Sequence, residues 1–167
     1  MLHKFDRRNR PNTTVLLNIY REGIAEKAKQ YTYVSSEHDR MRMAEEDFLN
    51  YVNTVFFGVH NAWYFLWENV GTYVAALRVE PYKDGLLLSA LETAPALRNR
   101  GYGKSLVISL ICYLRDSQSL PLYSHIHKRN AISEHLHQIC GFEKVSDYAI
   151  LLDGTITSDY TTYSVEK

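Results

Sequence analysis

One loop of this chain gathers the residue types that bind anions. The segment from Arg98 to Lys104 reads Arg-Asn-Arg-Gly-Tyr-Gly-Lys. Apolar residues then recur at helical spacing, namely Leu106, Val107, Leu110, Ile111 and Leu114. A glycine-containing turn at a helix N-terminus directs several backbone N–H groups at one point, where the helix dipole is positive. The pattern predicts a site for a phosphate or pyrophosphate group. The alternative is a plain strand-to-helix connection with a solvated basic loop.

This loop differs from two common phosphate-binding patterns. The spaced GxxxxGK[ST] sequence of a P-loop is absent. The dinucleotide fingerprint GxGxxG fails at its third glycine, where Leu106 stands. What remains is R-x-x-G-x-G, beginning at Arg98, between an apolar run and a helical pattern.

The elements around the loop follow from hydrophobic period and turn residues. Leu86–Thr93 is an apolar run that Ala94-Pro95 ends, because proline cannot donate to a strand ladder. Two helices are expected upstream, from the Asn12-Thr13-Thr14 cap to about Gln30 and from Ser36 or Asp39 to about Asn50. The remaining expected elements are strands at Met1–Asp6, Ala62–Trp67, Thr72–Glu80 and Leu122–His127, a short helix beginning at Asn130 with Ile132, Leu136 and Ile139 facing inward, and a closing hairpin of Phe142–Leu152 and Thr155–Val165.

Composition limits the function classes. Lys and Arg together number 19, as do Asp and Glu, so no net charge favours nucleic acid or an anionic membrane. No apolar run is long enough to span a bilayer, and the N-terminus lacks the apolar stretch of a signal peptide. Cys112 and Cys140 form no disulfide framework, and we expect reduced thiols in the core. A single cytoplasmic domain over residues 1–167 is expected.

A second segment carries a family resemblance. Residues 130–142 read Asn-Ala-Ile-Ser-Glu-His-Leu-His-Gln-Ile-Cys-Gly-Phe. With the R-x-x-G-x-G loop upstream, this segment resembles the GNAT superfamily of acetyl-CoA-dependent N-acyltransferases, whose pattern N-x-x-A/S-x-x-L-Y-x-x-x-G-F it follows. The family's frequent tyrosine falls at His137. The resemblance implies an α/β (α+β) fold with a mixed, mostly antiparallel central sheet, helices on both faces, and a splay between the fourth and fifth strands.

The resemblance also implies a coenzyme site. The backbone amides of the loop would hold the pyrophosphate of acetyl-CoA, with Arg98 near the phosphates. The strand end at Leu91–Thr93 would present backbone groups to the pantetheine arm, in the manner of an added strand. Asn130 would hydrogen-bond the same arm. The expected cofactor-binding set is Leu91, Thr93, Arg98, Asn99, Arg100, Gly101, Tyr102, Gly103, Lys104 and Asn130. No metal is expected.

Three side chains are the candidates for proton transfer. Glu92 interrupts an apolar run just before the strand end, where a charge either serves the cleft or pairs with an arginine. His125 lies on the neighbouring strand, and Glu80 is a further base candidate. His137 occupies the position of the family's presumed proton donor; a packing histidine is the alternative at both histidine positions. Trp63, Phe65 and Trp67 are expected in the acceptor pocket or in the core.

The sequence therefore predicts an N-acetyltransferase that passes the acetyl group of acetyl-CoA to a primary amine by direct attack in a ternary complex. One alternative is an acyltransferase for protein or peptide N-termini or lysines. Another is a non-catalytic module that binds or senses acetyl-CoA. A nucleic-acid-binding domain is opposed by the zero net charge. A homodimer through the exposed edge of the closing hairpin is possible.

Overall fold

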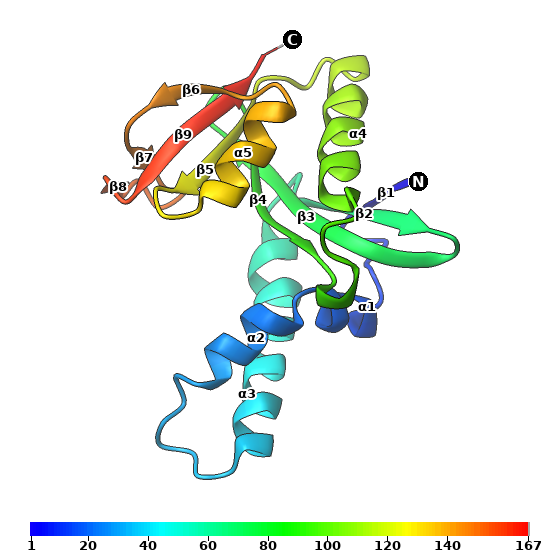
Figure 1. The fold of residues 1–167 in the computed structure, drawn as a ribbon, viewed down its shortest axis with the longest axis vertical. Coiled ribbons are helices and arrows are strands. Elements are labelled where there is room, and N and C mark those ends of the chain that lie inside the picture. The colour runs from blue at the N-terminus through cyan, green and yellow to red at the C-terminus, as the bar shows by residue number, and fades with distance from the viewer. Residues whose placement is uncertain (167) are drawn as a thin grey trace.

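The computed structural model describes residues 1–166 and places helices on both faces of a seven-stranded sheet (Figure 1). The strands are β1 (Leu2–Phe5), β2 (Trp63–Asn69), β3 (Thr72–Tyr82), β4 (Gly85–Thr93), β5 (Leu122–His127), β6 (Glu143–Ser146) and β9 (Tyr160–Val165), with β7 (Ala149–Ile150) and β8 (Ile156–Thr157) in a separate small sheet. The helices are α1 (Thr13–Ile19), α2 (Arg21–Ala28), α3 (Glu37–Asn50), α4 (Tyr102–Asp116) and α5 (Ala131–Ile139). A π-helical turn (Tyr51–Val55) and two 3-10 turns (Phe56–Gly58 and Pro95–Leu97) complete the order.

The strand order in the main sheet is β1-β2-β3-β4-β5-β9-β6, and only the β4–β5 pair is parallel. That pair is short: Leu86–Leu88 align with Leu122–Ser124, and neither strand pairs with the other beyond this point. Gly85 fixes the start of the pairing, because a Cβ there would lie 2.1 Å from the carbonyl oxygen of Pro121. The two strands then separate, so the mixed sheet and the splay between the fourth and fifth strands are confirmed.

Two apolar layers pack on opposite faces of the sheet. On β3, Leu77 and Val79 face a core that contains the inner side of α4. Their neighbour Ala76 faces a second core, built with α1, α2 and α3. This is the period-2 alternation of a strand that is covered on both faces. Trp63, Phe65 and Trp67 all pack in or against the α4 core, so none of the three lies on the α1–α3 face.

The helix predicted from Asn12 to Gln30 is two helices. The Asn12 side chain caps α1 as expected, and α1 ends at Tyr20, which also begins α2. The two helices meet at Tyr20, whose hydroxyl donates a hydrogen bond to the carbonyl oxygen of Ala90, 2.7 Å away on β4. The second predicted helix is confirmed as α3, with Ser36 as its N-cap.

The C-terminal part differs from the sequence prediction in two details. The closing hairpin bends, so that β6 pairs with β9 while β7 and β8 pair with each other. Ile132 and Ile139, predicted to face inward from α5, are 84% and 47% exposed. The inward side of α5 carries His137 instead, because a polar partner on β5 meets it there. Cys112 is exposed, which corrects the expectation of a core thiol.

Within residues 1–166, no helix combines the length and apolar character needed to cross a membrane.

Candidate functional site

The N-terminus of α4 has no side-chain cap. Gly101 stands at the N-cap position with φ of 80°, a left-handed conformation that glycine adopts without strain, and no side chain caps the helix. Within the described residues, the backbone N–H groups of Tyr102, Gly103 and Lys104 have no protein acceptor. By contrast, side chains of Asn12, Ser36 and Asn130 fill the N-termini of α1, α3 and α5. An open helix N-terminus is well suited to a phosphate group.

The end of β4 offers a free backbone edge beside this helix. Glu92 and Ser89 pair with Ala76 and Arg78 of β3, so two residues of β4, Ala90 and Leu91, lie opposite one residue of β3. This is a β-bulge, and Ala90 has the positive φ of 49° that accompanies it. On its other side β4 has no strand partner beyond Leu88. The edge is open to an extended ligand arm.

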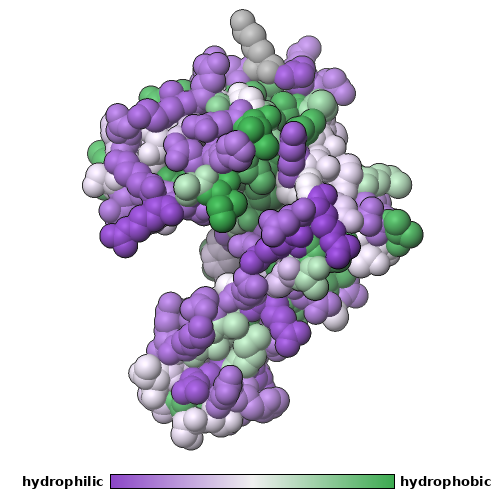
Figure 2. Space-filling model, viewed as in Figure 1, coloured by the Kyte–Doolittle hydropathy of each residue, from purple (hydrophilic) through white to green (hydrophobic). Residues whose placement is uncertain are grey.

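A groove of about 660 Å³ joins these features. It is lined by every predicted cofactor-binding residue except Arg100, that is by Leu91, Thr93, Arg98, Asn99, Gly101, Tyr102, Gly103, Lys104 and Asn130. Gly103 lies between α5 and the end of β4, because a Cβ there would lie 3.5 Å, an ordinary contact distance, from side-chain atoms of both Leu136 and Thr93. Figure 2 shows the surrounding surface deeply hollowed between the body that carries the C-terminal strands and the lobe that α2 and α3 form.

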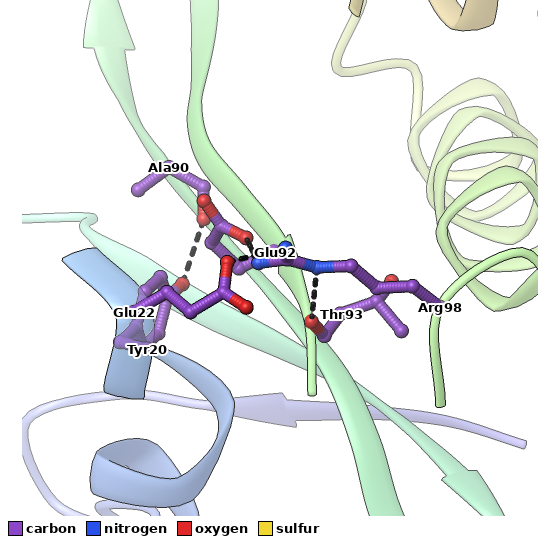
Figure 3. A network of polar contacts seen from close by, with 6 residues as sticks. All are labelled: Tyr20, Glu22, Ala90, Glu92, Thr93 and Arg98. Carbon is purple, nitrogen blue, oxygen red and sulfur yellow. Dashed lines mark hydrogen bonds and ion pairs between the residues drawn. The ribbon is translucent and has the colours of Figure 1, made fainter. Parts of the chain in front are cut away.

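Arg98 reaches back from the loop to two carboxylates (Figure 3). Its guanidinium pairs with Glu22 on α2 and, at 3.2 Å, with Glu92 on β4, while its Nε donates to the carbonyl oxygen of Thr93. Arg98 lines the groove, yet its charge is already matched here. Arg100 and Lys104 make no ion pair within the described residues, so these two side chains carry the unmatched positive charge of the loop.

Glu92 is the predicted catalytic residue that lies in the groove. Its side chain is 41% exposed and pairs with Arg98, as one alternative from the sequence expects, and Glu92 also lines the groove, so its role there stays a prediction. Partial burial raises the pKa of the Glu92 carboxyl above its usual value, the Arg98 guanidinium acts in the opposite direction, and Glu22 adds to the rise. A carboxylate with a raised pKa is a stronger base than an exposed one.

His125 is the first residue of β5 after its pairing with β4 ends, and it does not line the groove. Its Nε2 is 3.2 Å from the hydroxyl oxygen of Tyr82, and that hydroxyl donates to the carbonyl oxygen of Ile150. Since the hydroxyl has one proton to give, His125 Nε2–H is the donor in their contact. Burial lowers the pKa of His125, and the charge of Lys83 adds to the effect. The structure thus ties His125 to the C-terminal strands.

His137 is buried, 2% exposed, and does not line the groove. Its Nδ1–H donates to the carbonyl oxygen of Ser133 at 2.7 Å, so Nε2 accepts from the Ser124 hydroxyl at 3.0 Å. The ring also packs edge-on against Phe142. Burial lowers the pKa of His137, which favours this neutral form. In this position the histidine joins α5 to β5, with both ring nitrogens occupied.

Asn130 has a local role as well as a groove position. Its side-chain oxygen accepts from the backbone N–H of Ser133 at 3.0 Å and so caps α5. The oxygen is therefore occupied, and the amide nitrogen is the group of Asn130 that remains for a ligand.

Four groove residues were missed from the sequence: Glu22, Ile132, Ser133 and Leu136. The last three share the first turns of α5 with Asn130, so the family pattern around Asn130 contained a signal for them. Glu22 comes from α2, and only the tertiary fold brings it to Arg98.

Comparison with known proteins places the chain in a family. A family model described as the acetyltransferase (GNAT) family matches residues 22–142, which is most of the chain and includes both sequence motifs. The chain belongs to this family. A comparison with curated protein sequences finds no match.

Solved structures share the fold across the whole chain at low sequence identity. The ribosomal-protein-alanine N-acetyltransferase from Brucella melitensis is 18% identical, with a TM-score of 0.63 and coverage of 100% of this chain and 99% of that one. The PaiA N-acetyltransferase from Thermoplasma acidophilum, in complex with coenzyme A, is 13% identical, with a TM-score of 0.62 and coverage of 100% and 98%. A GNAT acetyltransferase from Elizabethkingia anophelis with acetyl-CoA bound is 12% identical, with a TM-score of 0.61 and coverage of 100% and 97%.

Proposed function

We propose that this chain transfers the acetyl group of acetyl-CoA to a primary amine by direct attack in a ternary complex. The observation that carries the proposal is the groove itself. It joins an uncapped helix N-terminus, an unpaired strand edge and a carboxylate in one continuous surface. Similar folds have been crystallised with coenzyme A or acetyl-CoA.

Each part of the groove has one task in this mechanism. The N–H groups of Tyr102, Gly103 and Lys104 bind the pyrophosphate, with Lys104 and Arg100 adding positive charge. The free edge of β4 between Leu91 and Thr93 holds the pantetheine arm, and a backbone N–H at this edge donates to the carbonyl oxygen that becomes negative during attack. Holding both substrates together lowers the barrier most, by up to about 7–11 kcal/mol in favourable cases.

Glu92 accepts the proton of the attacking amine, directly or through a water molecule. A free alkyl amine has a pKa of roughly 10 and is mostly protonated at neutral pH, so a base at the attack point is needed. Such a base typically contributes about 10²–10⁴-fold, so its loss weakens transfer more than it abolishes it. Glu80 and His125 are secondary base candidates, because neither lines the groove. We also propose a cytoplasmic location, and a homodimer stays a prediction.

A non-catalytic acetyl-CoA-binding module is the second candidate function. It is favoured by one observation: where the family pattern has a tyrosine, this chain has a buried His137 whose two ring nitrogens are both occupied. The side chain at this position therefore supplies no proton to the leaving thiolate. Acyl transfer to protein N-termini or lysines remains the alternative within the enzyme class.

A thiol-release assay separates these candidates. The purified protein is mixed with acetyl-CoA and a panel of amines that includes small amines, polyamines, amino acids and peptides. The proposal expects release of coenzyme A that depends on one acceptor class. Acetyl-CoA that binds yet is never consumed, with His137→Tyr equally silent, establishes the binding module.

The same assay tests direct transfer. Neither cysteine is placed as an activated nucleophile, since Cys112 is exposed and makes no side-chain hydrogen bond within residues 1–166, and burial raises the pKa of Cys140. We expect the Cys112→Ser, Cys140→Ser double variant to keep its activity. Acetyl groups found covalently attached to the protein as a kinetically competent species contradict the ternary-complex mechanism.

A further inference from the structure

Three polar side chains form a row across the α1–α3 face of the sheet. Tyr64 on β2 lies directly opposite Arg78 on β3, and Arg78 lies directly opposite Ser89 on β4. Directly paired residues share a face, and Tyr64 belongs to the core on the α1–α3 side. The Tyr64-Arg78-Ser89 row is separate from the coenzyme groove, which none of the three residues lines.

Each member of the row has a buried polar atom without a hydrogen-bond partner. These atoms are the Tyr64 hydroxyl, the Arg78 Nε and the Ser89 hydroxyl. Tyr64 is fully buried, at 0% exposure. Native proteins satisfy the great majority of such groups, so neighbouring exceptions need an explanation. All three groups are hydrogen-bond donors on adjacent strands of one face, so an acceptor that reached this face would find donors from each strand.

Arg78 makes no direct ion pair within residues 1–166, although the carboxylate of Glu80, two residues along β3, interacts with its charge. Its guanidinium lies over the rings of Tyr51, at 5.1 Å, and Phe56, at 5.5 Å. It makes no ion pair or hydrogen bond within the described residues. Burial raises the pKa of Tyr64 to about 12, so this hydroxyl keeps its proton and stays a donor. A guanidinium fork flanked by two hydroxyl donors is a match for a planar carboxylate.

The row lies close to the attack point that we propose. Glu92 pairs with Ala76 on β3, and Arg78 follows Ala76 by two residues on the same strand and face. This spacing corresponds to about 7 Å along the strand. Glu80, a further two residues on, adds a buried carboxylate to the same face. A ligand whose carboxylate rests on Arg78 therefore has its amine within reach of a carboxylate of the protein.

We propose that the Tyr64-Arg78-Ser89 row binds the carboxylate of the acceptor, so that the acceptor is a small amine that also bears a carboxylate, as amino acids do. This inference rests on the proposed function and names its acceptor class. A polyamine brings only positive charge to Arg78, and a lysine within a protein has no carboxylate close to its amine.

The test compares acceptors that differ only at the carboxylate. Wild-type protein with acetyl-CoA is assayed for thiol release against pools of free amino acids, the matching amino-acid amides, and polyamines. We expect the acids to react with a kcat/KM about tenfold or more above that of the amides, the effect of one charge-assisted contact. Arg78→Gln should raise KM for the acids by a similar factor, with little change for the amides. Arg42→Gln, at an exposed arginine on α3, is the matched control.

A stability measurement separates binding from a structural role. Tyr64→Phe and Ser89→Ala remove hydroxyls that have no partner in the free protein, so we expect an equal or higher melting temperature together with a higher KM for the acids. A structural role lowers the melting temperature and leaves KM unchanged.

The outcomes distinguish the carboxylate site from the acetyltransferase activity on which it rests. Amides or polyamines that react as well as the acids overturn the carboxylate site and leave the acetyltransferase proposal standing. Acids that react equally well with Arg78→Gln also overturn the site. Acetyl-CoA that no pool consumes overturns both.

Discussion

Glu92 is the residue on which opposite electrostatic influences converge. Burial raises the pKa of its carboxyl, the Arg98 guanidinium lowers it, and Glu22 raises it again. The same three side chains form one contact network at the end of β4 (Figure 3). If Glu92 is the base, it acts only when deprotonated, so activity rises as the pH increases through its pKa.

Removing either of the two charged side chains near Glu92 should therefore shift the pH dependence of activity, in opposite directions for Arg98 and Glu22. Arg98→Gln removes the influence that lowers the pKa of Glu92, so the acid limb of kcat/KM shifts to higher pH. Glu22→Gln removes a nearby negative charge and leaves Arg98 to Glu92 alone, so the limb shifts to lower pH. The measurement is the pH dependence of kcat/KM for both variants beside wild type. Shifts in the same direction, or full activity in Glu92→Gln, remove Glu92 from the mechanism.

His137 provides a second prediction at the scale of one residue. Both ring nitrogens are hydrogen-bonded and the ring does not line the groove, so we assign it a structural role. His137→Phe leaves the buried Ser124 hydroxyl without its partner and should reduce the free energy of unfolding by ~1–3 kcal/mol. Urea denaturation measures this loss, while kcat of the folded protein should change little. A large loss of kcat with unchanged stability instead identifies His137 as a proton donor.

At the scale of elements, α4, β4 and α5 meet at Gly103. A Cβ at this position makes only ordinary contacts, at 3.5 Å, with Leu136 and Thr93 side-chain atoms. Gly103→Ala should therefore fold as well as wild type, or gain up to about 1 kcal/mol, because alanine is the better helix former. The added methyl group narrows the groove between β4 and α5, so acetyl-CoA should bind more weakly.

Gly23→Ala is the matched control for this variant. Gly23 lies in α2 with nothing within 4 Å of an added Cβ, and it does not line the coenzyme groove. It should show the same neutral or positive change in stability with unchanged acetyl-CoA affinity. If titration gives wild-type affinity for Gly103→Ala, the pyrophosphate is not held at this helix N-terminus.

Some of the helices and strands could be predicted from the sequence, and others could not. The Leu86–Thr93 strand, the glycine loop and α4 were predictable because apolar period, proline and glycine act locally there. The break at Tyr20 was not, because no proline marks it in the sequence. The inward face of α5 was assigned to Ile132 and Ile139 on period alone, while the buried Ser124–His137 contact decides the true face.

The candidate site likewise has residues that a sequence motif predicts and residues that only the tertiary fold brings together. The predicted coenzyme-binding residues are close in sequence, so a motif was enough to propose them, and nearly all of them line one groove. The pairing of Arg98 with Glu22 joins α2 to the loop, and the Tyr64-Arg78-Ser89 row joins three strands. Both depend on strand register and helix placement, which composition and period do not encode.

At the scale of the whole molecule, helices from both faces of the sheet meet the end of β4 at a single groove: α2 from one face, and α4 and α5 from the other. The β4–β5 pair holds together over three residues and then opens. Because α4 begins beside this opening, residues from its N-terminus and from the free edge of β4 line the same groove. The central claim is therefore that acetyl-CoA binds along β4 with its pyrophosphate on α4.

Calorimetric titration with acetyl-CoA tests this claim most directly, on wild type and on the Arg100→Ala, Lys104→Ala double variant. These two side chains carry the unmatched charge of the loop, and their exposure makes a folding defect in the variant improbable. We predict binding of one acetyl-CoA per chain, weakened by about tenfold or more in the variant, as expected for the loss of contacts to a charged group. Absence of binding to wild type, or equal affinity in the variant, contradicts the account.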